Sequence, residues 1–493
     1  MLQFIQMGTS QNNITHDEVK SRSVKGVVAL ISRTFIIQII SLFATIALTV
    51  LLEPSIYGVF YLVSAVVNFL AYFSDIGLAA ALIQKKEEVT DDDLHTTFTI
   101  QQILVLSLLT LLFLATPFIK SFFGISSAGI YLMWAFGISL FLSSLKTIPS
   151  VLLERHIQFN KLIIPQIAET LVFNIVAVYC AWKGWGINAF TAAVLLRGLV
   201  GLFAMYLVSP WKPSLGIHKS SLSHLLRFGL PYQANSFLAM IKDDGMTILL
   251  GKLIGPSGLG YLGWASRWAN LPLRLFMDNV TKVAFPAFAR LQHDKEALKN
   301  AVEQSIKYLT LIIFPVLVAM GFVAGPLVGL IPRYSKWLPA LIPLYLYLVN
   351  SAWATISTLL TNLLSATGRI KVTFKLMIMW TVLTWAIMPF SAIKYGFTGV
   401  AFSVGLIAFS SAIVVVVARR SVQFSLGKAL STPILSSFIL SAFLFITKGF
   451  MTGYSSLIIV CLASVVVYFA SVIIFEGRSF ITKTSSYFHL SHA

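Results

Sequence analysis

The chain has 493 residues, of which 57% are hydrophobic and 11% are charged, and its mean hydropathy is +0.85. These values lie far from those of soluble domains and exclude an ordinary globular protein surrounded by water. The net charge of +18 would favour nucleic acid binding only if it gathered on one soluble face, whereas here it is spread over short segments between apolar blocks. We therefore expect a membrane protein with no nucleic acid partner.

Residues 1–24 are polar, and we expect a cytoplasmic N-terminal segment without a cleaved secretory signal. The two cysteines, Cys180 and Cys461, both fall in apolar blocks, which argues against a disulfide framework or a thiolate metal site. The sequence contains no Walker A, HExxH or GxSxG motif, so we expect no ATP-driven export, no cofactor, no metal and no enzymatic activity. The acidic run at 87–93 is expected to be a solvated loop.

The apolar blocks are about 18 to 25 residues long, which is the length that crosses roughly 30 Å of hydrocarbon as a helix. Backbone polar groups in lipid must be satisfied internally, so we predict an all-α polytopic membrane protein with about 14 transmembrane helices. The predicted spans are 28–52, 56–84, 97–117, 130–150, 163–182, 187–209, 228–250, 259–287, 306–330, 339–366, 372–391, 397–418, 430–448 and 455–475.

The basic residues in the loops are distributed unequally between the two sides of the membrane. With the N-terminus inside, 22 Lys and Arg fall on the cytoplasmic side and seven on the other, these seven being Lys120, Lys183, Lys252, Arg333, Lys336, Lys394 and Lys448. Because Lys and Arg are retained in cytoplasmic loops, this asymmetry predicts that both termini are cytoplasmic. The external loops are all short, so function is expected to lie within the membrane.

A short pattern, PSxxG, occurs twice, at 54–58 and at 256–260. Both copies occupy the same place in a six-span period, which predicts two pseudo-symmetric six-helix lobes related by an axis along the membrane normal. The expected division is a cytoplasmic segment at 1–24, an N-lobe at 25–209, a cytoplasmic inter-lobe loop at 210–227, a C-lobe at 228–418, two further spans at 419–475 and a cytoplasmic tail at 476–493.

Some basic residues fall inside predicted spans, where an ionised side chain costs at least about 2.5 to 3.5 kcal/mol and usually faces water or a partner. They are Arg33, Lys146, Arg197, Lys242, Arg267, Arg274 and Lys282. Arg33 and Lys146 lie near span ends, and for both the simpler interpretation is that they snorkel to the headgroups. Arg197 lies near the middle of span six and cannot reach water by its length alone.

Span eight has the clearest charge pattern, because Arg267, Arg274, Asp278 and Lys282 follow one another at intervals of seven, four and four residues. At about 100° per residue these side chains share one helix face, which we expect to look into the protein. Asp278 can partly neutralise Arg274 and Lys282. The alternative is a salt-bridge ladder that holds the lobes together, although one aspartate cannot neutralise three cations.

Span seven has Lys242, Asp243 and Asp244 in succession near its centre, and Gly245 directly after them favours a local break in the helix. Acidic residues at this depth are candidates for H⁺ or Na⁺ coupling.

Asp278 is a further candidate for coupling, and Asp75 is a weaker one. Asp278 and Asp75 follow the two PSxxG copies at nearly the same distance, and Asn68 lies on the same predicted face as Asp75. Glu169 ranks below them because it lies in the cytoplasmic half of span five.

Three stretches resemble the Wzx-type polysaccharide flippases of the PST family, within the MOP superfamily that also contains the lipid II flippases and the MATE exporters. They are LEPSIYGVFYLVSAVVNFLAYFSDIGLAAALIQKKE, ERHIQFNKL and GKLIGPSGLGYLGWASRWANLPLRLFMDNVTKVAFPAFARLQHDKEAL. The likeness extends over nearly the whole chain in length and span number, and the order of its loose motifs is informative.

This resemblance implies two lobes around a cavity that opens alternately to each side of the bacterial inner membrane. It implies outward transport of an undecaprenyl-diphosphate-linked oligosaccharide for O-antigen, capsule or exopolysaccharide assembly, coupled to H⁺ or Na⁺, with membrane lipids and polymerase or chain-length machinery as partners. Arg197, Arg267, Arg274 and Lys242 match the cationic cavity by position, and Arg33 is a further candidate.

Other activities stay open at this point. Another MOP exporter, such as one for lipid II, is the nearest alternative, and drug export would favour an acidic cavity. A membrane-embedded glycan polymerase or acyltransferase belongs to a different class and would be expected to have a large external loop or a catalytic His/Asp set. A scramblase-like role without coupling is the last alternative.

Overall fold

The computed structural model describes residues 37–477, and every regular element in that range is a helix. Ten of these helices are long and apolar enough to cross a membrane, and a shorter apolar helix, Ile37–Leu51, precedes them. The all-α polytopic architecture is therefore confirmed, and the count of 14 spans stays a prediction. One of the ten runs, Ile370–Arg419, includes two of the predicted spans.

The first helical group, here called the N-group, contains the first PSxxG copy at the start of α2. It consists of α2 (Pro54–Ala71), α3 (Leu78–Gln84), α4 (Asp91–Phe123), α5 (Ser127–Leu145), α6 (Thr147–Arg155), α7 (Phe159–Trp182) and α8 (Asn188–Val208). A connecting helix, α9 (Lys219–Met240), then leads into the π-helix η1 (Ile241–Gly245).

The second group, here called the C-group, follows η1. It consists of α10 (Met246–Ala269), the π-helix η2 (Leu273–Met277), α11 (Asp278–Leu291), α12 (Lys295–Leu330), the short η3 (Ser335–Ala340), α13 (Leu341–Ala366), α14 (Ile370–Phe409) and α15 (Ala412–Arg419). The last elements are α16 (Leu426–Thr447), the short η4 (Lys448–Phe450) and α17 (Tyr454–Glu476).

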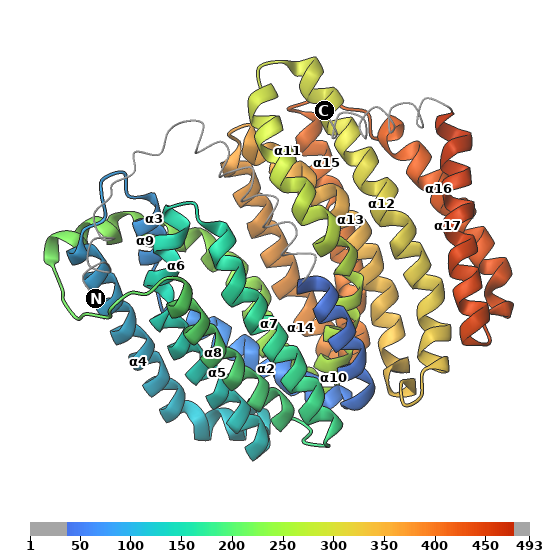
Figure 1. Cartoon of the computed structure of the whole chain (residues 1–493). Coiled ribbons are helices and arrows are strands. Elements are labelled where there is room, and N and C mark those ends of the chain that lie inside the picture. The colour runs from blue at the N-terminus through green and yellow to red at the C-terminus, as the bar shows by residue number, and fades with distance from the viewer. Residues whose placement is uncertain (1–36, 478–493) are drawn as a thin grey trace.

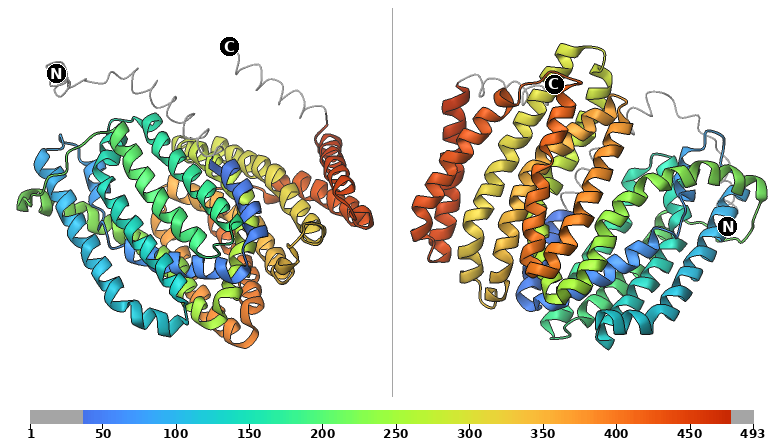
Figure 2. Two further views of the ribbon diagram at one scale, coloured as in Figure 1. Left: turned by 60° about the horizontal axis from the view of Figure 1, so that its bottom comes forward. Right: turned by 180° about the vertical axis from the view of Figure 1, so that it is seen from behind.

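The two groups lie side by side, with α2 and α10 between them at the lower end of the view in Figure 1. The helices α16 and α17 lie at the outer edge of the C-group, beside α12 (Figure 2). Tyr468 of α17 donates a hydrogen bond to the carbonyl of Leu311 at 2.8 Å, and Lys307 pairs with Glu476 at 2.6 Å. These contacts fasten α17 to α12.

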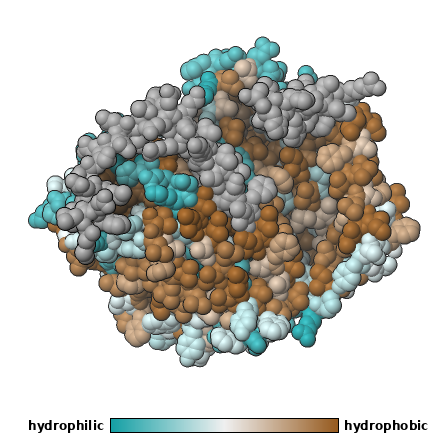
Figure 3. Space-filling view, viewed as in Figure 1, coloured by the Kyte–Doolittle hydropathy of each residue, from teal (hydrophilic) through white to brown (hydrophobic). Residues whose placement is uncertain are grey.

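An apolar band covers the side of the molecule seen in Figure 3, with hydrophilic residues above it and along its lower edge. Large side chains such as Phe203, Phe438 and Ile474 are exposed. A surface of this kind is unfavourable in water and is stable in hydrocarbon. The protein is therefore a multi-pass membrane protein.

Two predicted boundaries differ from the structure. The predicted span 56–84 is interrupted between α2 and α3, because Ile76 and Gly77 both have positive φ, at 50° and 77°, and Gly77 is the N-cap of α3. Asp75 accepts the backbone N–H of Ala79 in the first turn of α3. The predicted loop 210–227 contains the start of α9, whose Leu225 packs in a cluster with Leu78 and Phe98 of the N-group. The connecting helix α9 thus packs on the N-group before the chain enters η1.

The acidic run at 87–93 is also only partly a loop. Asp91 begins α4, and Thr90 and Asp93 cap that helix reciprocally, the Thr90 hydroxyl accepting the N–H of Asp93 and the Asp93 carboxylate accepting the N–H of Thr90. Asp93 also forms an ion pair with Lys85 at 2.6 Å. The carboxylates of this run therefore help to start a helix instead of remaining fully solvated.

The two PSxxG copies pack directly against each other where α2 crosses α10. A Cβ atom on Gly58 would lie 1.6 Å from the carbonyl oxygen of Pro256, and one on Gly260 would lie 1.9 Å from the carbonyl oxygen of Pro54. The last glycine of each copy thus faces the first proline of the other. Gly255 has φ +69° and separates α10 into two helical stretches, so that Pro256 begins the second stretch as Pro54 begins α2.

Buried aromatic rings lie beside this crossing. Trp337 is fully buried, stacks on Trp264 with centroids 5.5 Å apart, and donates its indole N–H to the carbonyl of Thr49 at 2.8 Å. Tyr334 bonds both to the Thr49 hydroxyl and to the indole N–H of Trp264 at 3.1 Å. The rings join the helix Ile37–Leu51 to α10 and η3 through satisfied polar groups.

We predict that Gly58→Ala and Gly260→Ala each destabilise the folded protein, because a methyl group cannot fit unless α2 and α10 move apart. Overpacking of this kind costs about 1 to 3 kcal/mol. The measurement is the thermal transition of the purified protein in detergent. Gly329→Ala in α12 is the matched control, since a Cβ there meets no atom within 4 Å. Equal transitions in all three variants would contradict the crossing.

Candidate functional site

A polar cavity of about 310 Å³ lies beside the crossing of α2 and α10, and we call it the central cavity. Tyr61 and Ser64 of α2, Arg267 of α10, Arg274 of η2 and Tyr347 of α13 contribute to its wall. Asp244 of η1 and the hydroxyls of Thr247 and Ser266 complete the polar lining. The cavity therefore receives groups from both helical groups.

Arg267 and Arg274 supply the positive charge of the central cavity. Both side chains are exposed, and within residues 37–477 neither has a carboxylate oxygen within the 4.0 Å of an ion pair. Both also border a small space beside the helix Ile37–Leu51, lined by the polar side chains of Gln38, Ser41 and Thr45. The two guanidinium groups are thus placed in polar surroundings and keep their hydrogen-bond donors available.

The π-helix η2 changes the predicted charge pattern of span eight. Arg274 lies within η2, and Asp278 and Lys282 come after it, exposed and outside the wall of the central cavity. A π turn contains one residue more than an α turn, which shifts later side chains by about 100° from a regular helix. No ion pair joins Asp278 to Arg274 or Lys282 in the described residues, so a salt-bridge ladder is not formed there.

A second π-helix, η1, contains the triplet of charged residues. The expected break is not present, because Gly245 and Met246 keep helical φ and ψ and the helix is locally widened instead. Lys242 pairs with its neighbour Asp243, and neither side chain lines the central cavity. Asp244 does line it, and its carboxylate accepts a hydrogen bond from Asn68 of α2. Asp244 therefore lines the cavity, while Lys242 and Asp243 lie outside its wall.

Arg197 lies in a different space, a cavity of about 560 Å³ within the N-group. Its Nε is 3.6 Å from an oxygen of Glu169, and its guanidinium lies 5.9 Å from the ring centre of Phe173. Lys146 forms an ion pair with the other oxygen of Glu169. In this arrangement Glu169 bridges two cations that come from different helices.

Asp75, a further predicted coupling residue, makes a local contact instead. Asp75 accepts the backbone N–H of Ala79 and does not line the cavity, while Asn68, predicted to share a face with Asp75, bonds to Asp244 instead. Arg33 lies outside the described residues. Of the described residues that the sequence proposes for binding or coupling, Arg267, Arg274 and Asp244 are the ones that line the central cavity.

Sequence reasoning missed the neutral polar residues of the central cavity and the central place of Glu169. Tyr61, Ser64 and Asn68 lie three and four residues apart on α2, so their spacing alone would have indicated a polar helix face. Tyr347 comes from a helix distant in sequence and gives no such signal. Glu169 meets Lys146 and Arg197 only because three helices converge, which a single sequence does not reveal.

The fold and the cavity define a class of multi-pass membrane protein in which two helical groups enclose a polar, cation-lined space. The chain belongs to a family described as polysaccharide biosynthesis protein, whose model matches residues 47–342.

Curated relatives have related names. The succinoglycan biosynthesis transport protein ExoT of Rhizobium meliloti (strain 1021) is 25% identical over 347 residues, covering 70% of this chain and 68% of that protein. The lipopolysaccharide biosynthesis protein WzxC of Escherichia coli (strain K12) is 26% identical over 236 residues, covering 47% of each chain. The teichuronic acid biosynthesis protein TuaB of Bacillus subtilis (strain 168) is 24% identical, covering 54% of this chain and 55% of that one. The chain thus spans about half the length of the last two.

Solved structures show the same fold. The lipid II flippase MurJ in an inward closed conformation superposes with a TM-score of 0.73 at 19% identity, over 92% of this chain and 99% of that chain. An inward-facing multidrug resistance transporter of the MATE family, in the MOP superfamily, gives a TM-score of 0.62 at 16% identity, over 80% of this chain and 97% of that chain. The predicted MOP-type fold is confirmed by these likenesses.

We predict that Glu169→Gln destabilises the protein, because Lys146 and Arg197 then lose the carboxylate between them. Arg197 is about half exposed, so water screens its charge and the expected loss of unfolding free energy is about 1 to 3 kcal/mol. The thermal transition of purified protein measures it. Glu154→Gln is the control, since Glu154 lines the same cavity and accepts a hydrogen bond from Ser150 but forms no ion pair among the described residues. Equal transitions for both variants would contradict the bridging role.

Proposed function

We propose that this protein is an alternating-access flippase that moves undecaprenyl-diphosphate-linked oligosaccharide from the cytoplasmic to the periplasmic leaflet of a bacterial inner membrane. The observation on which the proposal rests is the pair of guanidinium groups, Arg267 and Arg274, without a carboxylate partner among the described residues, in a cavity between two helical groups. The names of the relatives support a role in surface polysaccharide assembly.

The chemistry of the central cavity suits a diphosphate. Guanidinium groups bind phosphate oxygens through two parallel hydrogen bonds, and these bonds strengthen where water is scarce. Two arginines and one carboxylate, Asp244, give the wall a net positive charge when all three are ionised. Tyr61 and Tyr347 offer rings and hydroxyls to a sugar, while an isoprenoid tail can stay in the lipid beside the groups.

The volume of the central cavity implies movement during transport. About 310 Å³ lies at the lower end of the roughly 300 to 1,000 Å³ of ligand pockets, so several linked sugars need a wider state. We propose that Arg197 and Lys242 contact the oligosaccharide only in that state, because each is now paired, with Glu169 and Asp243 respectively.

We also propose that an H⁺ or Na⁺ gradient resets the carrier through Asp244. This carboxylate shares the cavity with both arginines, so a proton or Na⁺ on it changes the charge that the diphosphate experiences. Asp75 and Asp278 remain proposed as secondary coupling residues. The proposal places both termini in the cytoplasm and expects polymerase or chain-length machinery to receive the product.

Transport of lipid II is a second candidate, favoured by the fold likeness that covers 99% of the chain of a lipid II flippase. Complementation distinguishes the two functions. Our proposal expects the gene to restore surface polysaccharide in a flippase-deficient strain and to leave a strain depleted of its lipid II flippase unable to grow.

We predict that Arg267→Ala and Arg274→Ala each reduce transport about 10- to 100-fold, the effect of losing one charged hydrogen-bonding contact. Arg→Lys at either position is expected to retain part of the activity, because lysine keeps the charge but not the two-pronged geometry. Transport is measured as surface polysaccharide in a flippase-deficient strain at equal membrane levels of each variant. Lys282→Ala is the control from the same span, outside the cavity wall, and it should be fully active. Normal polysaccharide from both arginine variants would exclude their role.

We predict that Asp244→Asn uncouples transport from the ion gradient while cargo binding persists. In proteoliposomes, the wild-type protein should move lipid-linked sugar faster when a gradient of H⁺ or Na⁺ is imposed, and the variant should move it at one rate with or without the gradient. Asp243→Asn is the neighbouring control, since Asp243 is largely exposed and lies outside the cavity wall. Retained gradient dependence in Asp244→Asn would rule out this residue.

A further inference from the structure

A second basic site lies at one end of the C-group, on the face that the sequence predicts to be cytoplasmic. Three turns meet there around a pocket of about 660 Å³: the turn before α12, the turn between α13 and α14, and the turn after α15. We call it the basic pocket. It has about twice the volume of the central cavity and shares no residue with it.

The wall of the basic pocket has an excess of positive charge. Lys295, Lys299, Arg369 and Arg420 line it, and Glu296 is its one acidic lining residue. His293, also in the wall, adds a further group that can become positive. No ion pair or side-chain hydrogen bond within residues 37–477 engages any of the four cations.

Two further features make the pocket suitable for an anion. The hydroxyl oxygen of Ser421, a lining residue, is buried and has no hydrogen-bond partner. The helix α14 begins directly after Arg369, and no side chain caps its first N–H groups. A helix N-terminus favours negative charge, and a buried hydroxyl without a partner is costly unless a ligand completes it.

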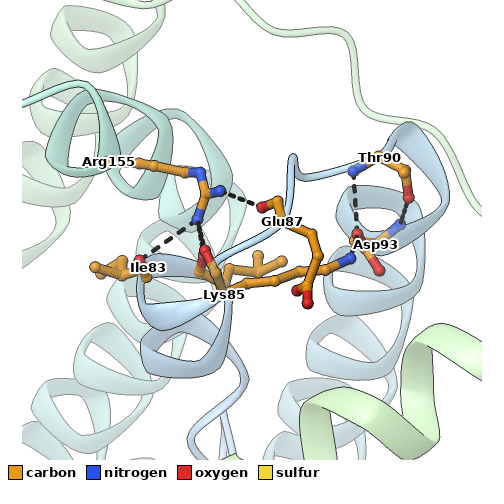
Figure 4. Close-up of polar contacts among 7 residues, drawn as sticks. Ile83, Lys85, Glu87, Thr90, Asp93 and Arg155 are labelled. Carbon is orange, nitrogen blue, oxygen red and sulfur yellow. Dashed lines mark hydrogen bonds and ion pairs between the residues drawn. The ribbon is translucent and has the colours of Figure 1, made fainter. Parts of the chain in front are cut away.

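A basic turn of the N-group, by contrast, has its cations paired within the protein (Figure 4). Arg155 ends α6 just before the turn that leads into α7, and its guanidinium donates to the carbonyls of Leu82 at 2.9 Å and Lys85 at 2.6 Å and also to that of Glu87. Lys85 in turn pairs with Asp93. The rule that Lys and Arg stay on the cytoplasmic side explains how many cations lie on this face. It does not explain why four of them line one pocket without a partner among the described residues. The cations of the basic pocket, unpaired within residues 37–477, therefore need a different explanation.

We propose that the basic pocket binds the phosphate of an anionic phospholipid headgroup from the leaflet on the basic face. The pocket lies at the ends of membrane-crossing helices, where headgroups are concentrated, and basic pockets of this kind suit such headgroups. Ile370, next to Arg369, is 65% exposed and offers apolar surface to an acyl chain. A bound headgroup would tie the three turns together and anchor the C-group in that leaflet. This site is separate from the proposed transport cavity.

The test measures binding of dioctanoyl phosphatidylglycerol to the full-length protein, purified in a neutral detergent, by microscale thermophoresis. The variant Arg369→Gln/Arg420→Gln is compared with Lys371→Gln/Lys428→Gln, which removes two exposed cations from the same face but outside the pocket wall. All measurements are made in an Arg274→Ala background, so that the central cavity contributes less. We expect the arginine pair to weaken binding about 30-fold and the lysine pair to leave it unchanged.

Additional arms identify the ligand and keep the test decisive. Dioctanoyl phosphatidylcholine should bind much more weakly than phosphatidylglycerol, and inorganic pyrophosphate should not displace the lipid. Tight pyrophosphate binding that depends on Arg369 and Arg420 would assign the pocket to a soluble phosphate and overturn the lipid proposal. Equal weakening in both double variants, or in neither, would overturn the pocket itself. Should the arginine variant fail to fold, Lys299→Gln is measured in the same way, with the same expected direction.

Discussion

The cost of an ionised side chain between membrane helices is the constraint on which this structure depends. Such a side chain needs an opposite charge or access to water. The N-group meets this requirement by pairing, since Glu169 lies between Lys146 and Arg197. Beside the α2–α10 crossing, Arg267 and Arg274 have no such partner among the described residues and border polar space instead. Their charge is therefore available to a ligand.

The crossing of α2 and α10 places this charge between the two helical groups. Gly58 and Gly260 allow each helix to lie against the proline carbonyl at the start of the other, which gives a close contact with no long side chains. The two π-helices lie on either side of α10, at the segments that contribute Asp244 and Arg274. Interruptions of this kind are often found at functional sites and allow a helix to change direction. In the proposed cycle, the groups would separate around the crossing while the charged residues stay with their helices.

Much of the fold follows from the sequence, because apolar block length and the distribution of Lys and Arg report on the solvent around each segment. The repeated PSxxG pattern predicted two lobes, but the packing of its two copies against each other is known only from the structure. The charged residues were harder to place. Regular helical spacing put Asp278 and Lys282 beside Arg274, but a π turn depends on tertiary packing and shifts them away. The bridging role of Glu169 likewise depends on contacts between segments that no local pattern specifies. The bond between Asp75 and the N–H of Ala79 is local, and it follows from the positive φ of Ile76 and Gly77, which helical periodicity does not reveal.

The most direct test of the account compares how tightly the purified protein binds three lipids that differ only in their head: undecaprenyl diphosphate, undecaprenyl phosphate and undecaprenol. If the charge of Arg267 and Arg274 recruits the cargo, affinity should fall in that order, and the differences should nearly vanish in Arg267→Ala/Arg274→Ala. If undecaprenol binds as tightly as the diphosphate, or if the double variant keeps the same order and spacing of affinities, the central cavity does not recognise the cargo through its positive charge.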